Sequence, residues 1–209
     1  GHKDRNIVPV AAALVRGLGF ISHRITLGHS GIKPNEDRIT EPDVFERDSL
    51  DNATPDLRHT LDMVRTGQIA GRGLPFVLVG HSRGGAQTIR IAATAARDDW
   101  PIKPAAVVCL APVSRHGYLH AAELERFERE GYAARPCARA EGGSVRMGRA
   151  WFRHWLDEPD RDHFSEDVRD TACPVLVIHA TGDDAVGIEH AERIEELAGE
   201  HSKTDWAFG

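Results

Sequence analysis

One short stretch limits the fold of this chain more than any other part of the sequence. An apolar run over residues 76–79 is followed by a Gly-x-Ser-x-Gly turn centred on Ser82 and then by a helical pattern that continues to about Arg97. The apolar run does not alternate with polar residues, which predicts a strand buried on both faces, as in a parallel sheet. A buried strand that leads through a glycine turn into a helix is typical of an α/β protein.

The rest of the chain repeats this alternation of strands and helices. Short apolar runs predict strands, and apolar residues at helical spacing predict helices. The predicted helices cover residues 6–19, 54–69, 83–97 and 188–197, and the predicted strands cover residues 20–27, 105–110, 175–178 and 203–208. This order predicts an α/β fold with a mostly parallel sheet flanked by helices.

The composition excludes several classes of protein. A chain of 209 residues with 41% hydrophobic residues suits a single domain over residues 1–209, and a net charge of −6 without a basic run argues against nucleic acid as a partner. No segment approaches the roughly 18 apolar residues that a membrane helix needs. The three cysteines form no disulfide pattern, so a cytoplasmic location is expected.

The turn at Ser82 has the features of a catalytic nucleophile. A serine between a buried strand and a helix is held in a strained conformation that exposes its hydroxyl group. Gly80 and Gly84 are expected to leave room for this turn, because a side chain at either position would clash with the neighbouring element. The N-terminus of the following helix suits an oxyanion, and the backbone N–H of Arg83 is the expected first donor. The sequence lacks the Gly-Lys-Ser/Thr of a phosphate-binding loop.

A second motif lies at residues 174–186, with the sequence PVLVIHATGDDAV. Together with the turn at Ser82, it resembles the α/β-hydrolases of the carboxylesterase or dienelactone-hydrolase-like kind, whose later strand ends in His-Gly-x-x-Asp-x-x-Val. The resemblance implies that Asp183 is the triad acid, which fixes the histidine tautomer and stabilises the imidazolium. Asp184 is the alternative, and a purely structural Asp-Asp turn before a helix is a third interpretation. His179 resembles a structural position of the family and not the base.

The chemistry that the resemblance implies is acyl transfer to water. Ser82 would attack an ester or a related carbonyl, the Arg83 N–H would help to hold the oxyanion, and water would release the acyl group. The expected partner is a small-molecule ester or acyl substrate, and no metal or organic cofactor is implied. A catalytically inactive binding scaffold, or a thioesterase or peptidase of the same fold, is the alternative.

Both ends of the chain depart from the pattern of the family. The family begins with several strands and a His-Gly loop that supplies the second oxyanion N–H, which here falls at or before Gly1. The family's catalytic histidine follows the last strand, whereas His190 and His201 precede the strand predicted at residues 203–208. We therefore expect the base to lie beyond Gly209 in a longer gene product. An inactive protein is the alternative.

Residues 114–171 interrupt the alternation and are predicted to form a helical cap over the carboxyl edge of the sheet. Two amphipathic helical segments are expected in this cap, one over residues 121–130 and one that carries Met147, Trp151 and Trp155 at four-residue spacing. The aromatic residues of the second segment fit either an acyl pocket or the packing core of the cap: Trp151, Phe152 and Trp155.

Three weaker signals lie near these motifs. Gly28–Gly31 resembles a loop beside the family's active site, which implies a shaping role, and an ordinary turn fits equally well. A cation in the first turn of a helix is disfavoured, so the Arg83 side chain is predicted to pair with a carboxylate in the loop of residues 28–54. His116 and His120 have a metal-binding spacing, but no third ligand is evident and a solvated surface is favoured.

Overall fold

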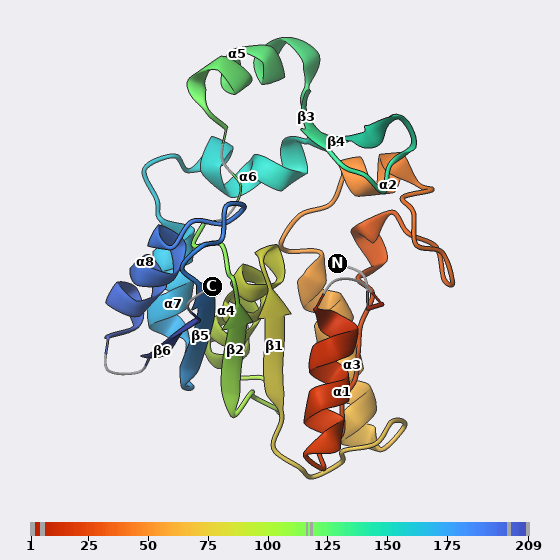
Figure 1. Ribbon diagram of the computed structural model, residues 1–209, viewed down its shortest axis with the longest axis vertical. Coiled ribbons are helices and arrows are strands. Elements are labelled where there is room, and N and C mark those ends of the chain that lie inside the picture. The colour runs from red at the N-terminus through yellow and green to blue at the C-terminus, as the bar shows by residue number, and fades with distance from the viewer. Residues whose placement is uncertain (1–2, 5–6, 116, 118, 200–201, 208–209) are drawn as a thin grey trace. The chain divides into compact units, whose positions relative to one another are not determined.

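The chain forms two compact units in the computed structural model (Figure 1). Unit 1 comprises residues 1–60 and 117–160, and unit 2 comprises residues 61–116 and 161–209. The structure describes residues 3–4, 7–115, 117, 119–199 and, for the backbone alone, 202–207. Each unit has its own helices and its own sheet.

A parallel sheet forms the centre of unit 2, as the alternation of strands and helices predicts. Its strands lie in the order β1-β2-β5-β6, and every neighbouring pair is parallel. Their bounds are Val77–His81 for β1, Ala106–Leu110 for β2, Val175–Ala180 for β5 and Ser202–Ala207 for β6. Because parallel strands end at the same side, the turns that follow β1, β2 and β5 meet at one edge of the sheet.

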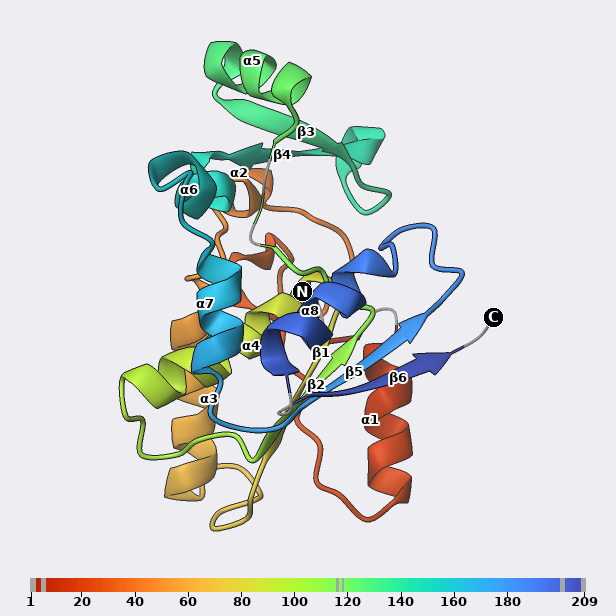
Figure 2. The same ribbon diagram turned by 90° about the vertical axis from the view of Figure 1, so that its left-hand side faces the viewer.

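Three helices of unit 2 lie on one face of this sheet (Figure 2). They are α4 (Arg83–Arg97), α7 (His163–Asp170) and α8 (Glu189–Ala198). The strand register places a row of buried side chains under them, in which Val107 stands between Leu78 and Val175. The prediction that β1 is buried on both faces is wrong for the described residues, because Val77 and Val79 are each 49% exposed on its other face.

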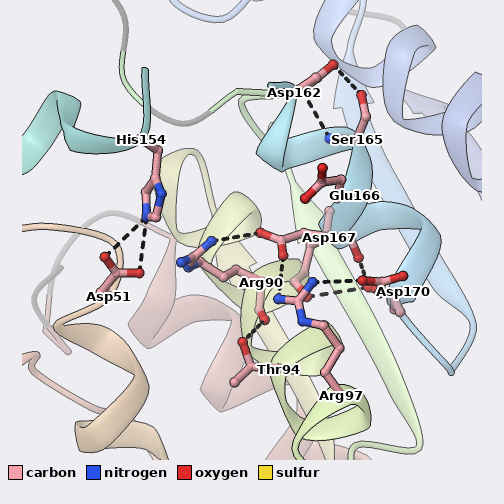
Figure 3. A network of polar contacts seen from close by, with 12 residues as sticks. Asp51, Arg90, Thr94, Arg97, His154, Asp162, Ser165, Glu166, Asp167 and Asp170 are labelled. Atoms are coloured by element: carbon pink, nitrogen blue, oxygen red, sulfur yellow. Dashed lines mark hydrogen bonds and ion pairs between the residues drawn. The ribbon is translucent and has the colours of Figure 1, made fainter. Parts of the chain in front are cut away.

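An ion-pair network joins α4 to α7 (Figure 3). The Asp167 side chain is only 2% exposed and accepts hydrogen bonds from Arg90 at 3.2 Å and from Arg97 at 2.7 Å. Arg97 also pairs with the more exposed Asp170 at 2.9 Å. Because α4 begins directly after Ser82, these pairs help to fix the helix that carries the glycine turn.

The first part of unit 1 consists of short helices and long connections. It contains α1 (Val8–Gly17), a 3₁₀ turn (Gly28–Ser30), α2 (Pro42–Glu46) and the start of α3 (Ala53–Thr66). The strand predicted over residues 20–27 is wrong, because these residues pair with no strand in the described part of the chain. Residues with high β-propensity form a strand only where a neighbour supplies the ladder hydrogen bonds and the cross-strand contacts.

The second part of unit 1 combines helices with an antiparallel hairpin. Helix α5 (Ala121–Glu130) has the bounds that the sequence predicts. The hairpin strands β3 (Tyr132–Pro136) and β4 (Ser144–Gly148) were not predicted, and α6 (Arg149–Asp157) follows them directly. Met147 therefore lies in β4, so the prediction that it shares a helix with Trp151 and Trp155 is wrong.

The aromatic residues of α6 pack into a local core of unit 1. Phe152 is 2% exposed and meets the Phe127 ring edge to face, with the centroids 5.5 Å apart. The Trp151 indole N–H donates to the Phe45 carbonyl oxygen at 2.8 Å. The buried members of the cluster are Leu119, Phe127, Ala133 and Phe152, with Trp151 and Trp155 packed against them. These contacts favour the packing interpretation of the aromatic residues, while the role of residues 114–171 as a cap stays a prediction.

Candidate active site

Ser82 lies where β1 ends and the chain turns directly into α4. Its φ of 54° and ψ of −124° fall outside the regions that residues with a side chain normally occupy. Two backbone hydrogen bonds hold this conformation. The Ser82 N–H donates to the Leu110 carbonyl at 2.9 Å, and the Ser82 carbonyl accepts the Gly85 N–H at 2.9 Å.

Close contacts require glycine at two positions around this turn. A Cβ atom at Gly80 would lie 2.1 Å from the carbonyl oxygen of Gly84, and a Cβ atom at Gly85 would lie 2.7 Å from the Cβ of Pro112. At Gly84 itself, apart from its chain neighbours and the nearby backbone of α4, no heavy atom of the described residues lies within 4 Å of the Cβ position. The expected clash at Gly84 is therefore wrong, because it is the Gly84 carbonyl, and not its side-chain position, that faces β1.

A second strained turn lies beside Ser82, at the end of β2. Ala111 has a φ of 42°, which is unfavourable for a residue with a Cβ atom. The turn places the buried Pro112 against Gly85 and brings the Val113 N–H within 3.4 Å of the Ser82 carbonyl oxygen. Strained backbone is concentrated at functional sites, so two adjacent strained residues make this edge of the sheet the candidate site.

Arg83 is the first residue of α4. The N–H groups in the first turn of a helix have no carbonyl partner within the helix, and they carry positive potential. This position suits the role of oxyanion donor. The predicted pairing of the Arg83 side chain with a carboxylate of residues 28–54 concerns both units and stays a prediction.

Asp183 lies in the turn that follows β5, at the same edge of the sheet as Ser82. Its Oδ1 accepts the N–H of Ala185 at 2.9 Å and the N–H of Val186 at 3.0 Å. The N–H groups of Val186 and Ala185 hold the pKa of Asp183 below its usual range, against the opposing effect of partial burial. The carboxylate form that a triad acid needs is therefore favoured.

Electrostatics also relate Asp183 to the serine turn. The neighbouring His179 and His81 lower the pKa of Asp183 further, and His81 directly precedes Ser82. Asp183 is half-buried, whereas Asp184 is exposed. Of the two carboxylates considered from the sequence, Asp183 is the better placed.

His179 is buried at the end of β5 and is bound to the turn that follows. Its Nε2 lies 2.8 Å from the Val186 carbonyl oxygen, and because a carbonyl only accepts, Nε2 carries the proton. Its Nδ1 is buried and has no hydrogen-bond partner among the described residues. These contacts agree with a structural role for His179.

His190 lies in the first turn of α8 and is bound to the segment that follows β2. Its Nδ1 is 3.0 Å from the Ser114 backbone nitrogen and 2.9 Å from Ser114 Oγ. A backbone N–H only donates, so Nδ1 accepts and cannot donate to a triad carboxylate. Burial lowers the pKa of His190, and the nearby Arg115 adds to this effect. In this arrangement His190 is not the base.

The remaining candidates lie outside the described residues. They are His201, which was one alternative for the base, and His116, which has a metal-binding spacing to His120. The second oxyanion donor, expected at or before Gly1, also lies outside the described residues. In the described ranges, no group of three or more His, Cys, Asp or Glu side chains is placed to hold a metal ion. No described helix has both the length and the apolar character that crossing a membrane requires.

The loop of residues 28–31 is anchored within unit 1. The Gly28 N–H donates to Asp56 Oδ2 at 2.7 Å, and the Gly31 carbonyl accepts two backbone N–H groups. Gly31 has a φ of 67°, and a Cβ atom there would lie 2.7 Å from the Glu41 carbonyl oxygen. Glycine is thus required at position 31, and the shaping role of this loop stays a prediction.

The sequence matches the model of the alpha/beta hydrolase family over residues 4–206. This match covers nearly the whole chain, so the chain belongs to the alpha/beta hydrolase family. The α/β fold and the resemblance inferred from the motifs are thereby confirmed. No curated protein matches the chain.

Solved structures share the fold at low sequence identity. Est1E from Butyrivibrio proteoclasticus with bound ferulic acid is 19% identical, with a TM-score of 0.65, over 100% of this chain and 76% of that one. Alpha/beta hydrolase domain-containing protein 10 from mouse is 15% identical, with a TM-score of 0.58, over 100% and 77%. The esterase domain of a Rhodothermus marinus protein is 19% identical, with a TM-score of 0.50, and the match covers 78% of this chain and only 59% of that domain. These similarities concern the fold alone.

Proposed function

We propose that this hydrolase cleaves a carboxylic ester or a related acyl bond, with Ser82 as the nucleophile. The observation that carries the proposal is the backbone of Ser82, whose φ of 54° at the junction of β1 and α4 is stabilised by the close packing of Gly80 on the first turn of the helix. A serine in such a turn presents its hydroxyl group beside the N–H groups of a helix N-terminus, where an oxyanion is stabilised.

The proposed reaction proceeds through an acyl-enzyme. Ser82 Oγ attacks the carbonyl carbon while a histidine takes the hydroxyl proton, and the Arg83 N–H stabilises the negative charge that forms on the carbonyl oxygen. Asp183, whose carboxylate form is favoured by two backbone N–H groups, orients the histidine and stabilises the imidazolium. The alcohol leaves with the proton, and water then releases the carboxylic acid.

The structural neighbours support an ester as the substrate. They include an esterase domain, an Est1E structure that contains ferulic acid and a monoacylglycerol lipase from Paleococcus ferrophilus. A small-molecule ester is therefore the first substrate class to test, and a thioester or a peptide bond comes second. The three cysteines are free, which supports the proposed cytoplasmic location.

The test is the hydrolysis of p-nitrophenyl acetate and butyrate by the full-length gene product and by its Ser82→Ala and Ser114→Ala variants, with folding checked by circular dichroism. Ser114 is the matched control, because it is a buried serine that follows the neighbouring strand and is bound to His190. We expect Ser82→Ala to fall to the background rate and Ser114→Ala to keep most of its activity. Equal hydrolysis by Ser82→Ala and the unsubstituted protein would rule out Ser82 as the nucleophile.

A non-catalytic binding scaffold is the second candidate, and one observation favours it. The hydrogen bonds of His179 and His190 go to Val186 and Ser114, and among the described residues neither ring bonds to Asp183. A folded full-length gene product that hydrolyses none of the esters or thioesters in a Ser82-dependent manner would support the scaffold.

A further inference from the structure

One partly buried contact links the end of β5 to the turn that holds Asp183. The His179 Nε2–H donates to the Val186 carbonyl oxygen at 2.8 Å. The N–H of the same Val186 donates to Asp183 Oδ1 at 3.0 Å. The Val186 residue is thus held on both sides, by the imidazole at its carbonyl and by the carboxylate at its N–H.

We propose that His179 is a positioning residue that fixes the Asp183 carboxylate by holding Val186 in place. The catalytic part of this inference rests on the proposed function, in which Asp183 is the triad acid. The structural part, that the imidazole determines the environment of the carboxylate, stands on the described contacts alone.

Two other hydrogen bonds are seen in the described part of the turn, and both are internal to it. The Asp183 N–H donates to the Ala180 carbonyl at 3.2 Å, and the Ala185 N–H donates to Asp183 Oδ1 at 2.9 Å. Residues 181–182 and 184–185 are exposed, so burial does not hold the turn in place. His179, in contrast, is 1% exposed and follows the buried Val175 and Val177 on the same face of β5. The imidazole therefore connects an exposed turn to the rigid strand.

The contact makes a specific chemical demand on the side chain at position 179. The Val186 carbonyl can only accept, so the imidazole must carry its proton on Nε2. Leucine has a comparable apolar volume and no donor, whereas glutamine can place an N–H donor at the distance of Nε2 from the backbone. Comparing His179→Leu with His179→Gln isolates the donor, because both substitutions remove the imidazole and only glutamine restores an N–H.

The first test is the titration of the Asp183 carboxyl group, followed by its ¹³C resonance in the unsubstituted protein, His179→Leu, His179→Gln and Val177→Ala. Val177→Ala is the matched control, because it removes buried volume from the same face of β5 without touching the turn. We expect the pKa of Asp183 to rise toward its ordinary value in His179→Leu and to remain lower in His179→Gln and Val177→Ala. Equal pKa values in the Leu and Gln variants would overturn the proposal.

A second measurement needs no substitution. The ¹⁵N shifts of the His179 ring in the unsubstituted protein report the tautomer, and we expect protonation at Nε2 with a bare Nδ1. The opposite tautomer would leave the Val186 carbonyl without its donor and would overturn the proposal even where a variant does not fold.

The kinetic test separates this inference from the proposed function. With p-nitrophenyl butyrate, His179→Leu is expected to lower kcat by about 10- to 100-fold with little change in KM, since a displaced carboxylate misaligns the base without affecting substrate binding. Val177→Ala should keep its kcat, and His179→Gln should recover most of it. If Ser82→Ala is as active as the unsubstituted protein, the proposed function fails, whereas the Asp183 titration still decides the positioning role.

Discussion

Replacement of Gly80 by alanine tests the packing that produces the strained serine turn. The new Cβ atom would lie 2.1 Å from the Gly84 carbonyl oxygen, 2.4 Å from the Gly84 carbonyl carbon and 2.7 Å from the Gly85 nitrogen. Carbon–oxygen contacts in proteins are about 3.3 Å or longer, so the first turn of α4 has to move by about 1 Å from β1. Overpacking costs roughly 1–3 kcal/mol, and a clash with backbone atoms that cannot rotate away belongs at about 3 kcal/mol.

This loss is large enough to measure by thermal unfolding. At roughly 2–4 °C per kcal/mol for a chain of this size, Gly80→Ala should lower Tm by about 6–12 °C. Gly84→Ala is the matched control, because beyond its neighbours and the local helix backbone no described heavy atom lies within 4 Å of its Cβ position. Alanine is also favoured over glycine in a helix by up to about 1 kcal/mol. Its Tm should stay unchanged or rise. Equal Tm values for the two variants, followed by circular dichroism, would refute the packing argument.

Three further substitutions, two of them with a matched control, test the ion-pair network, a histidine and the triad acid. Asp167→Ala should lower the free energy of unfolding by about 3 kcal/mol, because it removes the buried carboxylate that binds both Arg90 and Arg97, whereas Asp170→Ala, at the exposed end, should cost about 0–1 kcal/mol; similar urea midpoints would contradict this ranking. Burial lowers the pKa of His190 in the folded state, so the unfolded chain binds the proton first as the pH falls. The contribution of neutral His190 to the free energy of unfolding is therefore complete above a pH of about 6.5 and is lost as the pH falls below it. The loss of stability between pH 7.5 and pH 5.5 should therefore be smaller in His190→Gln, and an unchanged loss would argue against this assignment. Asp183→Asn should lower kcat by up to about 10⁴-fold and Asp184→Asn only slightly, and the reverse order would assign the acid to Asp184.

The elements that the sequence predicts well are those in which the local pattern and the tertiary contacts agree. Helix α4 and helix α5 have the predicted bounds, because their apolar faces and their end signals coincide. The strand expected at residues 20–27 does not form, because its propensity is not matched by a neighbouring strand among the described residues. Four-residue spacing predicts a helix that contains both Met147 and Trp151, but the hairpin ends at Gly148 and α6 begins at Arg149, so the pattern crosses a boundary between two elements.

In the candidate site, too, the features set by the local sequence could be predicted and those set by contacts between distant residues could not. Ser82 and Asp183 could be singled out because each lies in a motif whose spacing reflects local backbone geometry. The strained φ of Ala111 could not, because alanine carries no signal for a left-handed conformation. The link from His179 through Val186 was also missed, since the motif gives a histidine and a valine but not the hydrogen bond between them.

The most direct test of the central claim, that Ser82 is an activated nucleophile, is covalent labelling of the full-length gene product with a fluorophosphonate, followed by peptide mass spectrometry. The account predicts one adduct per chain, located on Ser82, formed more slowly in Asp183→Asn and absent from Ser82→Ala. An adduct on another residue, or no adduct on the folded protein, would contradict it.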